Sequence, residues 1–410
     1  MKMRSVALVE WNWEGHHPTY FNHFLLALEG LGMNVLAICP NPAEVEELVN
    51  QTRQGVSTDR VQRSRIQFKQ IRVPALRFHN LRPRRIGAID WTFRHFTGIE
   101  HQVLEWTREA GTHVDAILYA CMYDRDFAWV KSVQPFLRLP WMGLYLHAMS
   151  YRMPGRFLPY TRRLPCPEKM FSGRLCKGVG TLDEGIVEQF STAIGKPVVA
   201  LPDVADERPA MAAEERVLGQ RLRQFAAGRP IVGLFGHLQK SKGILTFLEA
   251  ARMPGASRIC FALAGDLLWP ADQSEVLQIR LALEKAPNIW HHFQRIPSEP
   301  CLSDLIEACD VISAAYIDFP HSSGIQSKAA VLSKPLIVSD GYLMAERSRR
   351  YRMGEVVPQD NARALLEAVL RITKDPAAWV ANNNPLWEDY RCEHSFDRFK
   401  ACLKELLDTV

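Results

Sequence analysis

Short runs of apolar residues alternate along most of the chain with longer segments in which apolar residues recur at helical spacing. In the first half the runs lie at 5–11, 34–39, 115–120, 141–147, 178–182 and 198–201. After a break, further runs lie at 231–235, 259–264, 289–293, 311–315, 336–339 and 355–357. Runs that are apolar through their whole length predict parallel strands covered by helices on both faces. The pattern therefore predicts an α/β protein with two doubly wound sheets.

The break in this alternation predicts the domain boundary. Residues 203–213 are rich in Pro, Asp and Glu, which is typical of an interdomain linker. The linker would separate an N-terminal domain, 1–202, from a C-terminal domain, 214–385. The remaining region, 386–410, contains an amphipathic helix. The clearest helical patterns lie at 19–31, 126–136, 183–195 and 396–407.

Composition favours a globular protein over a disordered or membrane-spanning one. The chain has 410 residues, of which 47% are apolar and 23% charged, enough for two ordinary cores. No apolar run approaches the roughly 20 residues of a membrane span, and the first residues are expected to form a strand rather than a signal peptide. Nine scattered cysteines without a Cys-x-x-Cys pair indicate a reducing compartment, so we expect a cytoplasmic protein.

One region is strongly basic although the net charge is only +5. Between residues 53 and 94 lie eleven Lys and Arg residues and only two acidic ones. Such a region fits peripheral contact with anionic lipid headgroups at the inner membrane surface, or an anionic acceptor. It fits a solvated surface excursion equally well. No nucleic-acid-binding motif accompanies the charge, so a nucleic-acid partner is not expected.

Two segments in the second half place small or polar residues and positive charge where a strand gives way to a helix. The first is 236–243, and the second is the tetrapeptide HSSG at 321–324. Unpaired N–H groups and the helix dipole make a helix start suitable for anionic phosphate. Two such starts predict a diphosphate bound between them. The candidate residues are His237, Lys242, His321, Ser322, Ser323 and Gly324.

These motifs resemble the carboxy-terminal half of GT-B glycosyltransferases, in particular the retaining enzymes of family 4. The family pattern Gly-Arg-Leu-x-x-x-Lys-Gly corresponds to GHLQKSKG at 236–243, with Lys242 at the diphosphate lysine and His237 replacing the arginine. The family's second motif corresponds to Ser323-Gly324, Lys328-Ala329 and the segment SKPLI at 333–337. The resemblance implies a GT-B fold: two Rossmann-like domains that face a central cleft, with the nucleotide sugar in the C-terminal domain.

The family's Glu-x7-Glu motif is degenerate in this chain, because its two positions fall on Pro320 and Lys328. In the family the second glutamate binds the nucleotide ribose and the first lies near the sugar. Lys328 is open to two interpretations. It binds a phosphate or ribose oxygen directly, or it points away and leaves the ribose to another residue. Asp318 is a candidate substitute for the first glutamate.

The resemblance assigns further residues. His147 ends the run 141–147 and corresponds to a histidine close to the reacting carbon of the sugar, which implies a catalytic role in orienting the sugar and stabilising developing charge. Gly15 corresponds to a small-residue loop that touches the donor, and the adjacent His16 and His17 are capping or acceptor-side residues. Arg295 follows the run 289–293, where the family's loop receives the nucleotide base.

Metal and redox chemistry are not expected. No Asp-x-Asp or His-x-Asp/Glu cluster stands in a suitable loop. The resemblance implies instead that helix starts and basic side chains stabilise the leaving diphosphate. Gly178 and Gly180 are not followed by a third glycine at the spacing of a dinucleotide-binding fingerprint, so oxidoreductase chemistry is disfavoured.

The leading hypothesis is a retaining, metal-independent glycosyltransferase that uses a nucleotide sugar. Its acceptor, bound by the N-terminal domain, could be lipid-linked, anionic or a small molecule. A nucleotide-sugar epimerase on the same fold is one alternative, although the loss of both glutamates weakens it. The other alternative is a non-catalytic GT-B partner protein whose donor site has decayed.

Overall fold

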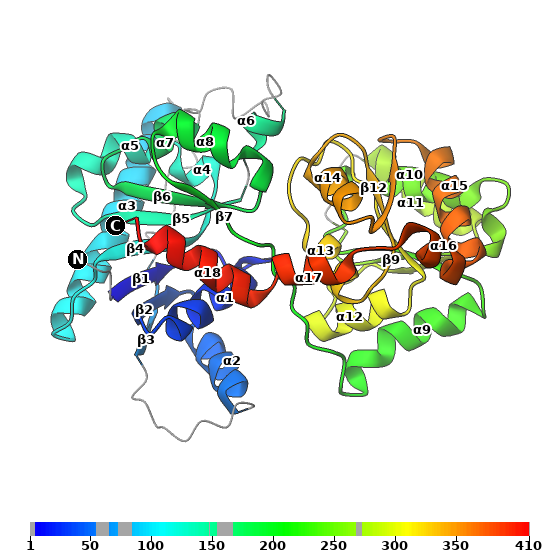
Figure 1. The fold of residues 1–410 in the computed structure, drawn as a ribbon, viewed down its shortest axis with the longest axis horizontal. Coiled ribbons are helices and arrows are strands. Elements are labelled where there is room, and N and C mark those ends of the chain that lie inside the picture. Colours follow the sequence, from blue (N-terminus) through cyan, green and yellow to red (C-terminus); the bar gives the residue numbers. More distant parts are fainter. Residues whose placement is uncertain are drawn as a thin grey trace. The chain divides into compact units, whose positions relative to one another are not determined.

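The computed structural model describes residues 5–54, 65–72, 84–146, 148–153, 167–267 and 273–409. They form two compact units, each built around its own parallel sheet (Figure 1). The first unit consists of Met1–Pro202 and Phe396–Val410, and the second of Asp203–Ser395. Among the described residues, no helix combines the length and the apolar character needed to cross a membrane.

The first unit contains a seven-stranded sheet in the order β3-β2-β1-β4-β5-β6-β7, with every neighbouring pair parallel. The chain runs outward from β1 to β3 and then continues on the other side of β1 with β4. The topological switch point, where ligands of such sheets bind, therefore lies between β1 and β4. The strands are β1 (Ser5–Val9), β2 (Asn34–Cys39), β3 (Ile66–Gln70), β4 (Ala116–Met122), β5 (Trp141–Tyr145), β6 (Cys176–Thr181) and β7 (Val198–Ala200).

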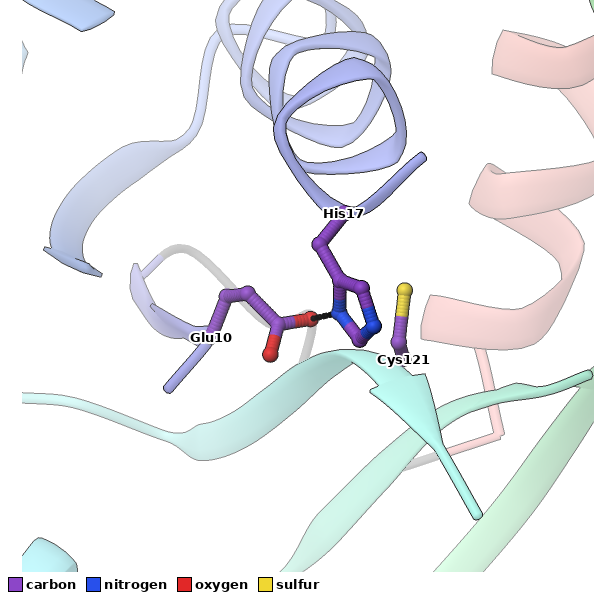
Figure 2. A group of neighbouring side chains, drawn as sticks. All are labelled: Glu10, His17 and Cys121. Carbon is purple, nitrogen blue, oxygen red and sulfur yellow. Dashed lines mark ion pairs between the residues drawn. The ribbon is translucent and has the colours of Figure 1, made fainter. Parts of the chain in front are cut away.

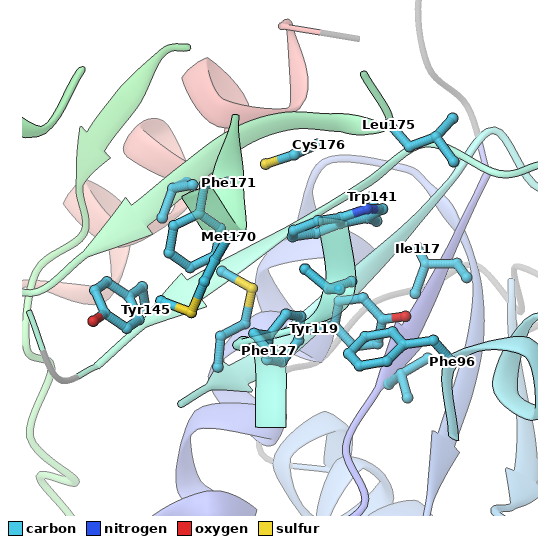
Figure 3. Close-up of a cluster of buried hydrophobic side chains, with 14 of the residues drawn as sticks. Phe96, Ile117, Tyr119, Phe127, Trp141, Tyr145, Met170, Phe171, Leu175 and Cys176 are labelled. Atoms are coloured by element: carbon cyan, nitrogen blue, oxygen red, sulfur yellow. The ribbon is translucent and has the colours of Figure 1, made fainter. Parts of the chain in front are cut away.

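Aromatic side chains fill the core beside β4 and β5 (Figure 3). Tyr119 of β4 and Trp141 of β5 both pack on Phe127, with ring centroids 5.2 and 5.7 Å away. Phe171 lies on the other side of Trp141, at 6.2 Å. Burying one such ring contributes roughly 1.5–3 kcal/mol. This packing fixes the carboxyl ends of the strands from which the site residues follow.

The helices of the first unit include one from the end of the chain. The amphipathic pattern at 396–407 forms α18, which packs on α1, β6 and β7. Phe399 of α18 meets Phe24 of α1 with ring centroids 5.1 Å apart. The helices are α1 (His17–Gly30), α2 (Pro42–Gln54), α3 (Arg84–Glu109), α4 (Asp124–Phe127), α5 (Val130–Val133), α6 (Met149–Arg152), α7 (Pro167–Phe171), α8 (Val187–Ile194) and α18 (Phe396–Leu407).

Two of the predicted helices differ from the structure. The helix predicted at 126–136 is instead broken into α4, α5 and a 3-10 turn, Gln134–Phe136. Pro135 has no backbone N–H to donate, which limits the helix there. The helix predicted from Asp183 begins only at Val187, because the Asp183 carboxylate accepts from Gly185 N and caps a preceding 3-10 turn. Gly195 ends it as predicted, in the left-handed conformation.

Part of the basic region 53–94 belongs to the folded sheet. Lys69 of β3 and the adjacent Arg72 lie over the Trp106 ring of α3, 5.8 and 5.2 Å from its centroid. Arg72 also pairs with Glu105 at 3.3 Å. Residues 55–64 and 73–83, with much of the charge, lie outside the described residues. The basic side chains at this end of the sheet thus pack on α3.

The second unit contains a six-stranded parallel sheet in the order β10-β9-β8-β11-β12-β13, whose switch point lies between β8 and β11. Both sheets confirm the predicted doubly wound α/β class. The strands are β8 (Ile231–Phe235), β9 (Cys260–Ala264), β10 (Ile289–His292), β11 (Val311–Ala314), β12 (Leu336–Ser339) and β13 (Gly354–Val357). The helices are α9 (Val217–Ala226), α10 (Ile244–Arg252), α11 (Gln273–Lys285), α12 (Glu299–Glu307), α13 (Gly324–Val331), α14 (Leu343–Arg350), α15 (Ala362–Lys374), α16 (Pro376–Asn383) and α17 (Trp387–Glu393).

Candidate functional site

The two predicted phosphate-binding segments follow the two strands that flank the switch point of the second sheet. Residues 236–243 follow β8, and residues 321–324 end the longer segment, 316–324, that follows β11. Ile317 N donates to Ser241 O at 2.8 Å, which ties the two segments together. Gly243 is left-handed, with φ 69°, and a Cβ there would lie 2.7 Å from Ala315 O. Only glycine therefore allows this close approach before α10 begins.

Lys242 is held by two aromatic rings of the neighbouring segment. Its Nζ lies 3.7 Å from the centroid of the Tyr316 ring and 4.7 Å from that of Phe319. Tyr316 is buried, so its ring is a fixed surface for the ammonium group. Cation–π contacts of this kind contribute about 0.5–2 kcal/mol. They restrict the lysine to the switch point without neutralising its charge.

The start of α13 carries a second basic group that the sequence did not reveal. Ser322 Oγ donates to Asp203 at 2.6 Å and accepts from Arg347 of α14, also at 2.6 Å. The guanidinium of Arg347 is buried and reaches the helix start through Ser322, whose hydroxyl also contacts the buried Asp203 carboxylate. Ser323 is the N-cap of α13. Gly324 is exposed, and a Cβ built on it would meet open space, so a ligand could approach the backbone there.

The remaining predicted donor residues are more dispersed. His321 lies beside Phe319, with ring centroids 5.5 Å apart. His237 is exposed in the segment after β8. Arg295 is also exposed, but it follows β10, which β9 separates from β8 in the sheet. Gly15 belongs to the first unit, and the predicted catalytic His147 lies outside the described residues.

Lys328, for which the sequence leaves two interpretations open, makes its contacts with α12 and with the segment 203–213. Its side chain is buried in α13, and Nζ forms an ion pair with Glu299 Oε2 at 2.9 Å. Nζ also donates to Asp206 O at 2.9 Å and to Ser303 Oγ at 3.1 Å. These contacts attach the segment 203–213, predicted as a linker, to α12 and α13 of the second unit. Lys328 therefore has a structural role.

Lys328→Ala is expected to lower the free energy of unfolding by about 2–3 kcal/mol, because it leaves buried acceptors without their charged donor. Lys374→Ala, an exposed lysine at the end of α15, is the control and should change stability by less than about 0.5 kcal/mol. Urea unfolding of both variants measures the difference. Equal stability of Lys328→Ala and wild type would contradict the structural role.

The switch point of the first sheet holds a second group of polar side chains (Figure 2). Glu10 follows β1, His17 opens α1 and Cys121 lies near the end of β4, and all three are buried. One potential ligand atom of each lies within 4.8 Å of the others. His17 Nδ1 is 3.0 Å from Glu10 Oε2, which is within ion-pair distance. Gly15, with φ 61°, forms the turn before α1.

No family model matches the sequence. No curated protein matches it either. Solved structures do match over the whole chain. Sucrose-phosphate synthase from Thermosynechococcus elongatus has a TM-score of 0.67 at 15% identity, covering 98% of both chains. HepE from Anabaena, in complex with UDP and glucose, has a TM-score of 0.67 at 14% identity, covering 100% of both. Trehalose 6-phosphate synthase from Burkholderia multivorans has a TM-score of 0.63 at 12% identity, covering 100% of this chain and 98% of the other. The chain therefore has the GT-B fold.

Proposed function

We propose that the protein is a retaining glycosyltransferase that takes a sugar from a nucleotide-sugar donor and needs no metal ion. The observation that carries this proposal is the pair of segments joined at the switch point of the second sheet. They bring Lys242 and the start of α13, with Arg347 behind it, to the place where ligands of such sheets bind. Positive charge and helix N–H groups at one place suit a diphosphate.

UDP-glucose is the donor that we propose to test first. The solved structures of HepE include complexes with UDP and with UDP-glucose, and their fold is shared by this chain. In our proposal the diphosphate lies against Lys242 and Gly324. Charge that grows on the leaving oxygen would be stabilised by groups already in place. The acceptor would be bound by the first unit and could be lipid-linked, anionic or a small molecule, with the basic region as a site of peripheral membrane contact.

A non-catalytic binding protein is the second candidate, and the position of Lys328 favours it. The residue at the position of the family's ribose-binding glutamate has a structural role, so the ribose needs another partner or is not bound. Such a protein would bind UDP and leave UDP-glucose intact. The absence of the glutamate pair also weakens the epimerase alternative, because proton transfer in the site needs acidic groups.

Purified protein is expected to release UDP from UDP-glucose at the same rate with and without EDTA, since helix starts and basic side chains replace a metal in neutralising the diphosphate. Coupled detection of UDP measures the rate, with water or an added sugar as acceptor. Loss of turnover in EDTA that magnesium or manganese restores would contradict metal independence. Binding of UDP without any turnover would favour the non-catalytic candidate.

A further inference from the structure

Two phenylalanine side chains are exposed next to one another on the surface of the first unit. Phe136 ends the 3-10 turn that follows α5 and is 62% exposed, and Phe93 of α3 is 37% exposed. Their ring centroids lie 5.1 Å apart in an edge-to-face arrangement. Folding leaves these rings in contact with water, so covering them with another apolar surface is favourable.

The segment that carries Phe136 is anchored to α3. Glu100 of α3 is buried, and its Oε1 accepts from the backbone N–H groups of Arg138 and Leu139, both at 2.7 Å. Phe93 and Glu100 are seven residues apart, close to two helical turns, and therefore lie on the same face of α3. The chain after the turn thus follows that face, and the aromatic pair has a fixed position.

Exposed basic residues lie on α5, on the chain after its 3-10 turn and on the neighbouring segment 172–175. They are Lys131, Arg138 and Arg174. Lys131 donates to Ser172 Oγ at 3.1 Å, and Gln134 Oε1 accepts from Leu175 N at 3.2 Å. These two contacts hold the segment 172–175 against α5 and its turn. The basic residues and the aromatic pair therefore belong to adjoining parts of one surface.

The acidic residues of these segments do not offset the positive charge. The segments 130–138 and 172–175 contain no acidic residue. In the part of α3 beside them, Asp90 pairs with Arg94 at 3.0 Å, and the buried Glu100 carboxylate accepts from backbone N–H groups. The surface around the aromatic pair is therefore positively charged and complements an anionic surface.

We propose that this surface docks on the anionic headgroups of a lipid bilayer. We call it the aromatic–basic face, and it consists of Phe93, Lys131, Phe136, Arg138 and Arg174. Apolar rings enter the boundary between headgroups and acyl chains, while Lys and Arg remain among the lipid phosphates. A soluble phosphate would use the basic residues alone, whereas a bilayer also covers the rings. The inference rests on the peripheral membrane contact in the proposed function and names its surface.

The first test measures sedimentation of the full-length protein with lipid vesicles. Wild type is expected to bind vesicles that contain phosphatidylglycerol, and to bind vesicles of phosphatidylcholine much more weakly. Salt at about 1 M, which shortens the screening length to about 3 Å, should release most of the bound protein. Wild type that does not sediment with the phosphatidylglycerol vesicles would overturn the inference.

Replacement of the most exposed ring separates the face from general adhesion. Phe136→Ser should lower binding to the anionic vesicles by roughly 10-fold, the scale of transferring one phenylalanine ring out of water. Phe136→Trp should bind at least as tightly as wild type, because tryptophan favours the headgroup region. Phe225→Ser is the matched control. Phe225 of α9 is 36% exposed in the second unit, with the Arg229 guanidinium 5.4 Å from its ring centroid.

Phe225→Ser should bind the vesicles as wild type does, and thermal unfolding should show that both serine variants are folded. If Phe136→Ser binds as tightly as wild type, the face is not the docking surface. Self-association that Phe136→Ser abolishes in the absence of vesicles, measured by analytical ultracentrifugation, would make the face an interface between two copies. That result would overturn the lipid assignment.

A charge-matched pair of variants tests the basic residues. Lys131→Gln combined with Arg138→Gln should lower binding about 20-fold, since each basic residue near an anionic surface contributes about fivefold. Lys285→Gln combined with Lys374→Gln removes the same charge from exposed positions of the second unit. The control should change binding by less than about twofold, because the effect is local to the contact. Equal losses in both double variants would mean that binding follows net charge, which would overturn the inference.

UDP affinity of the same preparations separates this inference from the proposed function. Phe136→Ser and wild type should bind UDP equally, since the proposed donor site lies in the second unit. UDP binding without vesicle binding would overturn the aromatic–basic face and leave the donor site in place. Vesicle binding that Phe136→Ser weakens, in a protein that does not bind UDP, would support the face and contradict the proposed function.

Discussion

Lys242→Ala is expected to weaken UDP binding by roughly 10- to 100-fold, the effect of losing a charge-assisted hydrogen bond worth about 1.5–3 kcal/mol. Of the two lysines in 236–243, Lys242 is the one whose ammonium group is held over the rings of Tyr316 and Phe319 at the switch point. Because those rings fix the side chain before a ligand arrives, little entropy is lost on binding. Isothermal titration calorimetry with UDP measures the change directly.

Lys240→Ala is the matched control, since Lys240 lies in the same 3-10 turn and carries the same charge. Its Nζ pairs with Glu275 at 2.6 Å, and its side chain is 74% exposed. Its replacement should change UDP affinity by less than about threefold, as for a rim charge far from the phosphate. Similar affinities for wild type and both variants would remove the phosphate role from Lys242 and weaken the proposed donor site.

His147→Ala is expected to lower turnover of UDP-glucose by about 10²-fold, the usual scale for a positioned catalytic group. The flanking residues are well placed in the first unit: Leu146 follows β5 and its N–H donates to Met122 O at 3.3 Å, and Ala148 is buried. UDP affinity should barely change, because in our proposal the second unit holds the phosphates. A group that acts only in the transition state alters turnover without altering ground-state binding.

Turnover and UDP affinity should be measured on the same preparations, with His113→Ala as the control. His113 precedes β4 and is largely exposed at the opposite edge of the sheet. If His147→Ala turns over UDP-glucose as fast as wild type, the catalytic assignment is wrong. If it binds UDP weakly as well, His147 contributes to the donor site and not only to the transition state.

The strands were predicted well because buried parallel strands consist almost entirely of apolar residues. The runs 231–235 and 336–339 match β8 and β12 at both ends, since a parallel strand covered on two faces is apolar throughout. The prediction of one continuous helix at 126–136 was wrong, because helical periodicity does not show where Pro135 limits the helix. The switch points could not be predicted from the sequence alone, because locating them requires the order of the strands in each sheet.

The partners of the site residues could not be predicted from local pattern. Ser322 meets Asp203 across 119 positions of the chain, and Arg347 contacts the same hydroxyl from a different helix. Glu10 was not singled out in the sequence, although it is buried beside His17 and Cys121 at the switch point of the first sheet. The available signal was its position after the first strand, at the carboxyl edge where parallel strands gather ligands.

The packing of α18 on α1, β6 and β7 has a consequence for biosynthesis. Once the first 202 residues have emerged from the ribosome, the surface that Phe399 and Leu403 later cover is still exposed to solvent. The whole second unit emerges before the helix that closes the first. The first unit therefore reaches its final form only after the second unit has been synthesised, and its apolar surface stays open to chaperones and to aggregation until then.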